Sequence, residues 1–98
     1  MKKTEDGVPA FEISDIGDLE ELKGGFWFEC AMISTCAPLF DGCDSNYEVE
    51  QELQTAGVIA ETDQTDSESC ALVVRFDLFH EAENFLGRLN HYLEQKAA

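Results

Sequence analysis

Residues 76–96 read FDLFHEAENFLGRLNHYLEQK, and their apolar side chains recur every three or four positions. This spacing is typical of one face of an α-helix. The stripe consists of Phe79, Ala82, Leu86, Leu89 and Leu93, and Phe85 and Tyr92 widen it. Asp77 is a plausible N-cap. The stretch therefore predicts a long amphipathic helix, which needs an apolar surface to pack against.

That surface is expected from the segments before the helix. Residues 58–62 (VIAET) and 69–77 (SCALVVRFD) are rich in β-forming residues, and an acidic stretch separates them. They predict a β-hairpin with a loop of about six residues. Residues 26–34 (FWFECAMIS) are apolar on both faces apart from Glu29, which favours a buried central strand. A buried helix running to Thr35 is the alternative.

The remaining segments are shorter. Residues 8–13 (VPAFEI) predict a short strand with Pro9 at its edge and with Phe11 and Ile13 on one face. Residues 35–44 contain Pro38 and Gly42 and predict a loop.

Two further helices are expected. Residues 45–56 (SNYEVEQELQTA) begin with a capping box and carry an apolar stripe that ends before a glycine. The box is Ser45 and Glu48, the stripe is Val49, Leu53 and Ala56, and the glycine is Gly57. Residues 15–22 (DIGDLEEL) space apolar residues three apart and predict about two helical turns, weakened by Gly17. The expected cap is Ser14 or Asp15, the apolar residues are Ile16, Leu19 and Leu22, and the stop is Gly24 and Gly25.

Together these elements predict an α+β fold in a single domain, residues 1–98. A three- to four-stranded, mostly antiparallel sheet with two or three helices packed on one face would bury every apolar stripe. A chain of 98 residues is long enough for one modest core.

The charge balance narrows the range of partners. The chain has 21 Asp and Glu against six Lys and Arg, a net charge of −15. Such a protein repels nucleic acid and anionic membranes, which leaves basic proteins, cations or neutral surfaces. The start, MKKTEDG, has no apolar run after its lysines, and no apolar stretch approaches the roughly 18 residues of a membrane span. We therefore expect a cytoplasmic protein.

The acidic residues are concentrated where basic ones are missing. Between Lys23 and Arg75 lie 51 residues without a Lys or Arg. Glu48 and Glu52 are expected as neighbours on one helix face, an arrangement that destabilises a helix slightly. The window also holds ten carboxylates, and we expect partner contacts from all of them except Glu29, namely Asp41, Asp44, Glu48, Glu50, Glu52, Glu61, Asp63, Asp66 and Glu68. Trp27 or Phe40, if exposed, would add an apolar anchor.

Motifs that would carry catalysis or bind metal are weak. Residues 44–55 resemble a calcium loop in their first positions, but Val49 and Thr55 stand where the loop needs Gly and Glu. His80 and His91 share a helix face about 16 Å apart, too far to meet around one atom. No nucleophile elbow or glycine-rich phosphate loop is present. We expect no cofactor and no enzymatic activity.

The four cysteines include no C-x-x-C pair. We expect Cys30 and Cys70 to be core residues, whereas Cys36 and Cys43 flank a loop and would form a disulfide if oxidised. A metal or redox protein built on these four residues is the third interpretation.

The leading interpretation is that the carboxylates replace phosphates in the basic groove of a nucleic-acid-binding protein. In size, acidity and lack of catalytic motif, the chain resembles the small inhibitors that phages and mobile elements make against bacterial defence, such as anti-CRISPR and anti-restriction proteins. This resemblance carries no motif. It implies an inhibitor of a CRISPR effector complex or another defence nuclease, in the host cytoplasm if phage-encoded. The alternative is a small regulatory adaptor domain that binds a protein partner through an apolar face, with its acidity serving solubility.

Overall fold

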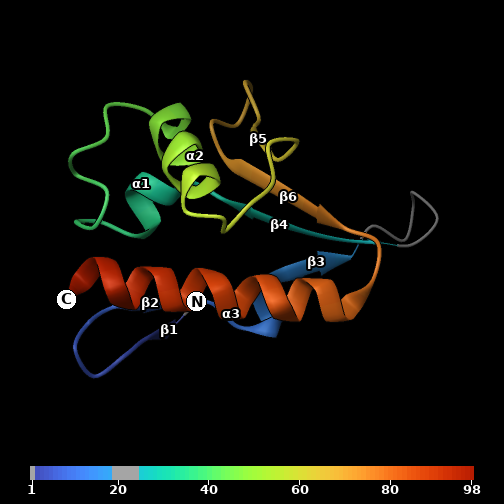
Figure 1. Cartoon of the computed structure of the whole chain (residues 1–98), viewed down its shortest axis with the longest axis horizontal. Coiled ribbons are helices and arrows are strands. Elements are labelled where there is room, and N and C mark those ends of the chain that lie inside the picture. Colours follow the sequence, from blue (N-terminus) through green and yellow to red (C-terminus); the bar gives the residue numbers. More distant parts are fainter. Residues whose placement is uncertain (1, 19–24) are drawn as a thin grey trace.

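A four-stranded antiparallel sheet with the strand order β3-β4-β6-β5 organises the fold (Figure 1). The computed structural model describes residues 2–18 and 25–98. The strands of this sheet are β3 (Ile16–Asp18), β4 (Phe26–Cys30), β5 (Gln64–Thr65) and β6 (Leu72–Phe76). A second sheet pairs β1 (Lys2–Lys3) with β2 (Pro9–Ala10). The helices are α1 (Met32–Thr35), α2 (Asn46–Thr55) and α3 (Phe79–Ala97), and a 3-10 turn spans Ile13–Asp15. The predicted α+β class is confirmed.

One face of the sheet builds the core. Alternate residues of β4 and β6 are buried on it, and α3 inserts Phe85 between Phe28 and Phe76, with ring centroids 5.0 and 5.3 Å apart. α2 lies on the same side, because the Thr65 side chain, which shares the core face with Leu72, donates a hydrogen bond to the Asn46 carbonyl of α2 at 3.3 Å. The opposite face carries the other residues of each strand, including Trp27 opposite Arg75.

The long helix α3 follows the prediction, except at its start. Ala82, Phe85, Leu86, Leu89 and Leu93 are all buried. Phe79 is wrongly placed on the buried stripe, because it is 41% exposed and contacts Phe26 edge-on at 5.3 Å. The N-cap is Leu78 rather than Asp77, and the Glu81 carboxylate accepts a hydrogen bond from the Leu78 N–H at 3.0 Å.

Helix α2 begins after Ser45 and ends before Gly57 as predicted, but its first turn lacks the predicted side-chain contacts. Gly57 adopts a left-handed φ of 76°, and its N–H and that of Val58 donate to Gln54 and Leu53 carbonyls at 3.1 and 2.9 Å. This is the Schellman arrangement that glycine favours. The predicted capping box is wrong: Ser45 is the N-cap without a side-chain bond, and Glu48 accepts from the Asp44 N–H instead. Ala56 is exposed, and Glu50 is buried in addition to the predicted Val49 and Leu53.

The predicted helix over 15–22 is wrong in its described part, because residues 16–18 form β3 on the edge of β4. Ile16 pairs with Phe28 and Gly17 with Trp27. A Cβ at Gly17 would lie 2.4–2.5 Å from the Trp27 indole, so the glycine admits the indole rather than weakening a helix. Residues 19–22 and Gly24 lie outside the described residues.

The predicted hairpin forms with a different first strand. Residues 58–62 are not a strand; Val58 and Ile59 are buried, and the chain then turns, with the Asp63 N–H donating to the Ala60 carbonyl at 3.0 Å. The strand that pairs with β6 is β5, and its register matches Gln64 with Val73 and Thr65 with Leu72.

Residues 26–34 combine both interpretations of that segment, a strand to Cys30 followed by the helical turn α1. Residues 8–13 contain β2, and Phe11 is buried, but Ile13 is 44% exposed because it starts the 3-10 turn.

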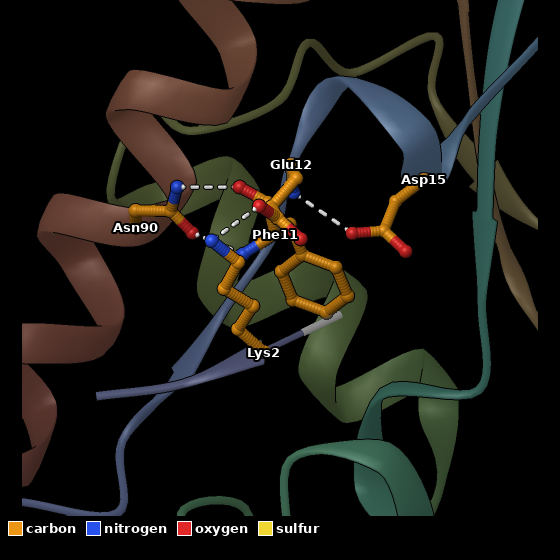
Figure 2. Close-up of polar contacts among 5 residues, drawn as sticks. All are labelled: Lys2, Phe11, Glu12, Asp15 and Asn90. Carbon is orange, nitrogen blue, oxygen red and sulfur yellow. Dashed lines mark hydrogen bonds and ion pairs between the residues drawn. The ribbon is translucent and has the colours of Figure 1, made fainter. Parts of the chain in front are cut away.

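The Asn90 side chain of α3 holds the N-terminal segment through two hydrogen bonds (Figure 2). The Asn90 carboxamide accepts from the Phe11 N–H at 2.8 Å and donates to the Phe11 carbonyl at 2.9 Å. The Phe11 ring meets Phe28 edge-on at 5.0 Å. Lys2 and Glu12 form an ion pair of 2.9 Å beside this contact. Asn90 thus substitutes for a backbone partner where the short strand β2 ends.

Candidate partner-binding surface

The acidic residues expected at the binding surface lie on α2 and on the segments flanking it. In Figure 1, α2 lies between the segment 36–45 and the turns of 60–70. Six of the nine side chains are exposed, namely Asp41, Asp44, Glu48, Glu61, Asp66 and Glu68. We call these six residues the acidic surface.

The other three carboxylates have partners inside the protein. Glu50 is only 7% exposed and accepts a hydrogen bond from the Thr65 N–H. The Asp63 carboxylate accepts from the Ala60 N–H at 2.9 Å and so closes the turn before β5. Glu50 thus joins α2 to β5, and Asp63 stabilises a local turn.

Glu52 links α2 to the end of α3. Its carboxylate accepts a hydrogen bond from the Tyr92 hydroxyl and forms an ion pair of 3.0 Å with the Lys96 ammonium. Burial, followed by this hydrogen bond to Glu52, raises the pKa of the Tyr92 phenol above its usual range. The Lys96 ammonium also lies 5.1 Å from the centre of the Phe40 ring. Phe40 is fully buried there, so it is not an exposed anchor, whereas Trp27 is half-buried.

Two members of the acidic surface also stabilise turns. Asp66 accepts hydrogen bonds from the Glu68 N–H and the Ser69 hydroxyl, both at 3.1 Å. Glu48 accepts from the Asp44 N–H before α2. These hydrogen bonds orient the two carboxylates, and both side chains remain exposed to solvent.

Acidic side chains are not confined to this surface. Glu83 and Glu94 are exposed on α3, and Glu5 is exposed in the turn after β1. The negative field therefore surrounds the molecule. What distinguishes the acidic surface is that the 51-residue window without lysine or arginine supplies it.

The cysteines and histidines do not assemble into a site. All four cysteines are free, and Cys70 is exposed with a φ of 56°, so its predicted place in the core is wrong. Cys36 is buried instead, and this burial, with Cys30 nearby, raises its thiol pKa to about 12. His80 and His91 are exposed. Within residues 2–18 and 25–98, no three His, Cys, Asp or Glu side chains are grouped to hold a metal ion.

Two depressions flank β6, which the sequence did not indicate. The larger, of about 540 Å³, is lined by residues 62–66 with Val73 and Arg75. The smaller, of about 300 Å³, is lined by Ala60, Thr62, Asp63, Val74, Arg75, Phe76, Glu81, Asn84 and Arg88. Both are lined by Thr62, Asp63 and Arg75. Arg75 is exposed and makes no ion pair with a described residue.

None of the helices in the described part of the chain is long and apolar enough to cross a membrane. The chain matches no protein-family model, no curated protein and no solved structure.

Proposed function

We propose that this protein is a non-enzymatic inhibitor that uses its acidic surface to occupy a basic nucleic-acid-binding site. A CRISPR effector complex or another defence nuclease is the kind of target that fits. The observation that supports this proposal most is the exposure of six carboxylates from a window with no lysine or arginine.

The physical basis is charge complementarity. A nucleic-acid-binding groove presents lysine and arginine side chains spaced to meet phosphates, and it gains affinity by releasing counterions. Carboxylates held on a folded surface meet the same side chains, and arginine binds a carboxylate through two parallel hydrogen bonds. A body with a charge of −15 also accelerates encounter with a basic target, and salt weakens this effect.

The experiment is a pull-down from bacterial lysate with this protein as bait, eluted with rising salt, with and without competing DNA or RNA. We expect a basic nucleic-acid-binding protein that salt releases and nucleic acid displaces. A retained partner that ignores both salt and nucleic acid would contradict the proposal.

A matched pair of variants tests the surface itself. Asp41→Asn, Glu61→Gln and Glu68→Gln together remove three charges from the acidic surface. Glu5→Gln, Glu83→Gln and Glu94→Gln together remove three exposed charges elsewhere, so both variants have the same net charge. We expect the first to weaken binding at least tenfold and the second to weaken it much less. Equal losses would mean that only the overall charge matters.

A second candidate function rests on an apolar patch at the start of α3. Leu78 is 54% exposed and Phe79 41% exposed, and Phe79 lies against the half-buried Phe26. Exposed apolar side chains that cluster mark contact sites more often than single ones do. An adaptor domain that binds a protein through this patch would keep its affinity in high salt. Leu78→Ser would then abolish binding, whereas the proposed inhibitor tolerates this change.

A further inference from the structure

The exposed edge of β6 is the feature from which we draw a further inference. Residues 74–76 of β6 pair with β4 on one side. On the other side β5 pairs only with Leu72 and Val73, and the described chain supplies no strand beyond them. An unpaired edge presents a row of backbone N–H and C=O groups that accept another strand.

The edge is open because the preceding chain turns away. Residues 58–62 would continue β5 along β6 if they were extended. Instead Val58 and Ile59 are buried, and the turn closed by Ala60 and Asp63 directs the chain elsewhere. The space next to residues 74–76 is therefore not filled by a strand.

The two depressions lie on either side of this edge. The larger includes Gln64, Val73 and Arg75, which point to the sheet face without helices. The smaller includes Phe76 of the core face and Asn84 and Arg88 of α3. In an extended peptide, successive side chains point to opposite faces of the sheet. A strand added at residues 74–76 would thus direct alternate side chains toward the two depressions.

Charge selects the occupant. In the larger depression the carboxylates of Asp63 and Asp66 outnumber the one guanidinium, that of Arg75, whereas in the smaller Asp63 and Glu81 are balanced by Arg75 and Arg88. The larger depression therefore favours a basic side chain, as does the charge of −15 on the whole molecule. A second copy of this chain would bring the same negative charge and be repelled. We propose that the edge of β6 at residues 74–76 binds an extended, lysine- or arginine-bearing segment of a partner protein by strand addition.

Strand addition has a distinctive backbone signature. A suitable probe is an eight-residue peptide that alternates lysine and valine, with both ends blocked. The N–H groups of alternate residues point to opposite edges of a strand, so N-methylation of all lysines blocks one edge and N-methylation of all valines blocks the other. We expect one methylated peptide to bind within about threefold of the parent and the other to lose at least tenfold. If both bind or both fail, the proposal is wrong.

The measurement is made at about 0.5 M salt, where the Debye length is well below its physiological value of about 8 Å. Hydrogen exchange by NMR supplies the location. We expect amides within residues 74–76 to gain at least tenfold protection with the parent peptide, and those of β3 to be unchanged. Protection elsewhere, or none, would overturn the assignment.

Two variants with equal net charge complete the test. Thr62→Arg places a positive charge at a residue that lines both depressions, whereas Gln51→Arg places it on the exposed side of α2. We expect Thr62→Arg to weaken the peptide at least tenfold and Gln51→Arg to change it less than threefold. Equal effects would overturn the proposed site, because they would mean that net charge alone governs the affinity. The result does not depend on the proposed function, because the peptide probe involves no nucleic-acid-binding site.

Discussion

At the scale of single residues, Gly17 shows that a residue on the opposite strand can be the reason for a glycine. In the sequence it interrupts a helix-like spacing. In the fold it lies under the Trp27 indole, which occupies the space where any other residue would have its Cβ. The requirement comes from the opposite strand, so a local pattern does not contain it.

We expect Gly17→Ala to lower the free energy of unfolding by about 1–3 kcal/mol, because the indole must move or the strands must separate. Gly87→Ala is the control: nothing lies within 4 Å of its would-be Cβ, and alanine in a helix is favoured by about 1 kcal/mol. Urea denaturation followed by the fluorescence of Trp27, the single tryptophan, measures both. If Gly17→Ala left both the free energy of unfolding and the fluorescence unchanged, the close contact between Gly17 and the Trp27 indole would be contradicted.

The raised pKa of Tyr92 predicts how the free energy of unfolding depends on pH. Burial and the hydrogen bond to Glu52 raise its pKa in the folded protein above the unfolded value of about 10. Below that pH the phenol is protonated in both states, so the full stability is present. Above it the unfolded state loses the proton first, and stability falls as pH rises. We expect Tyr92→Phe to flatten this fall above about pH 10, the ordinary pKa of the phenol, as measured by urea denaturation. A slope as steep as that of the unchanged protein would refute it.

At the scale of elements, Asn90 connects α3 to the N-terminal segment that follows β2. Its carboxamide satisfies both backbone groups of Phe11, 79 residues away in sequence. A polar residue next to an apolar helix stripe gives no sign of such a role. The two-residue strands β1 and β2 are too short to be stable without such an attachment.

We expect Asn90→Ala to lower the free energy of unfolding by about 1–3 kcal/mol, because both backbone groups lose their partner. Asn84→Ala removes the same side chain from an exposed position of the same helix and is the matched control. Hydrogen exchange provides the local readout: the Phe11 amide should exchange faster in Asn90→Ala only. Unchanged exchange at Phe11 would show that other contacts hold the segment.

At the scale of the whole molecule, charge opposes folding while packing supports it. The chain carries −15, and only two ion pairs are found within the described residues, Lys2–Glu12 and Lys96–Glu52. Repulsion among the remaining carboxylates is spread over many residues, so it responds to ionic strength.

We expect the melting temperature to rise as salt increases from about 10 to about 300 mM, where screening shortens the range of the repulsion. The variant with Glu5→Gln, Glu83→Gln and Glu94→Gln should show a smaller rise, because it begins with less repulsion. Differential scanning calorimetry measures both. A melting temperature that does not depend on salt would mean that the charges contribute little to the free energy of folding.

The candidate site could be anticipated only in part. The acids were evident from composition, but their exposure was not, since Glu50 and Glu52 lie in the same helical segment as Glu48 and yet face the protein. No local pattern in the sequence indicates the depressions beside β6. They exist because residues 58–63 turn away and do not extend β5 along β6.

The amino-acid sequence alone was enough to predict the α+β class, the helices α2 and α3, the strands β4 and β6, and the net charge. Each rests on a periodic or compositional pattern within one segment, where side-chain spacing and propensity act locally. Three features follow from the folded chain and not from any local pattern: residues 16–18 form an edge strand, β5 lies at residues 64–65, and some of the predicted carboxylates face solvent while others do not. Those features depend on contacts between segments far apart in the chain, such as Gly17 with Trp27 and Glu50 with Thr65, and distant contacts leave no period in the local sequence.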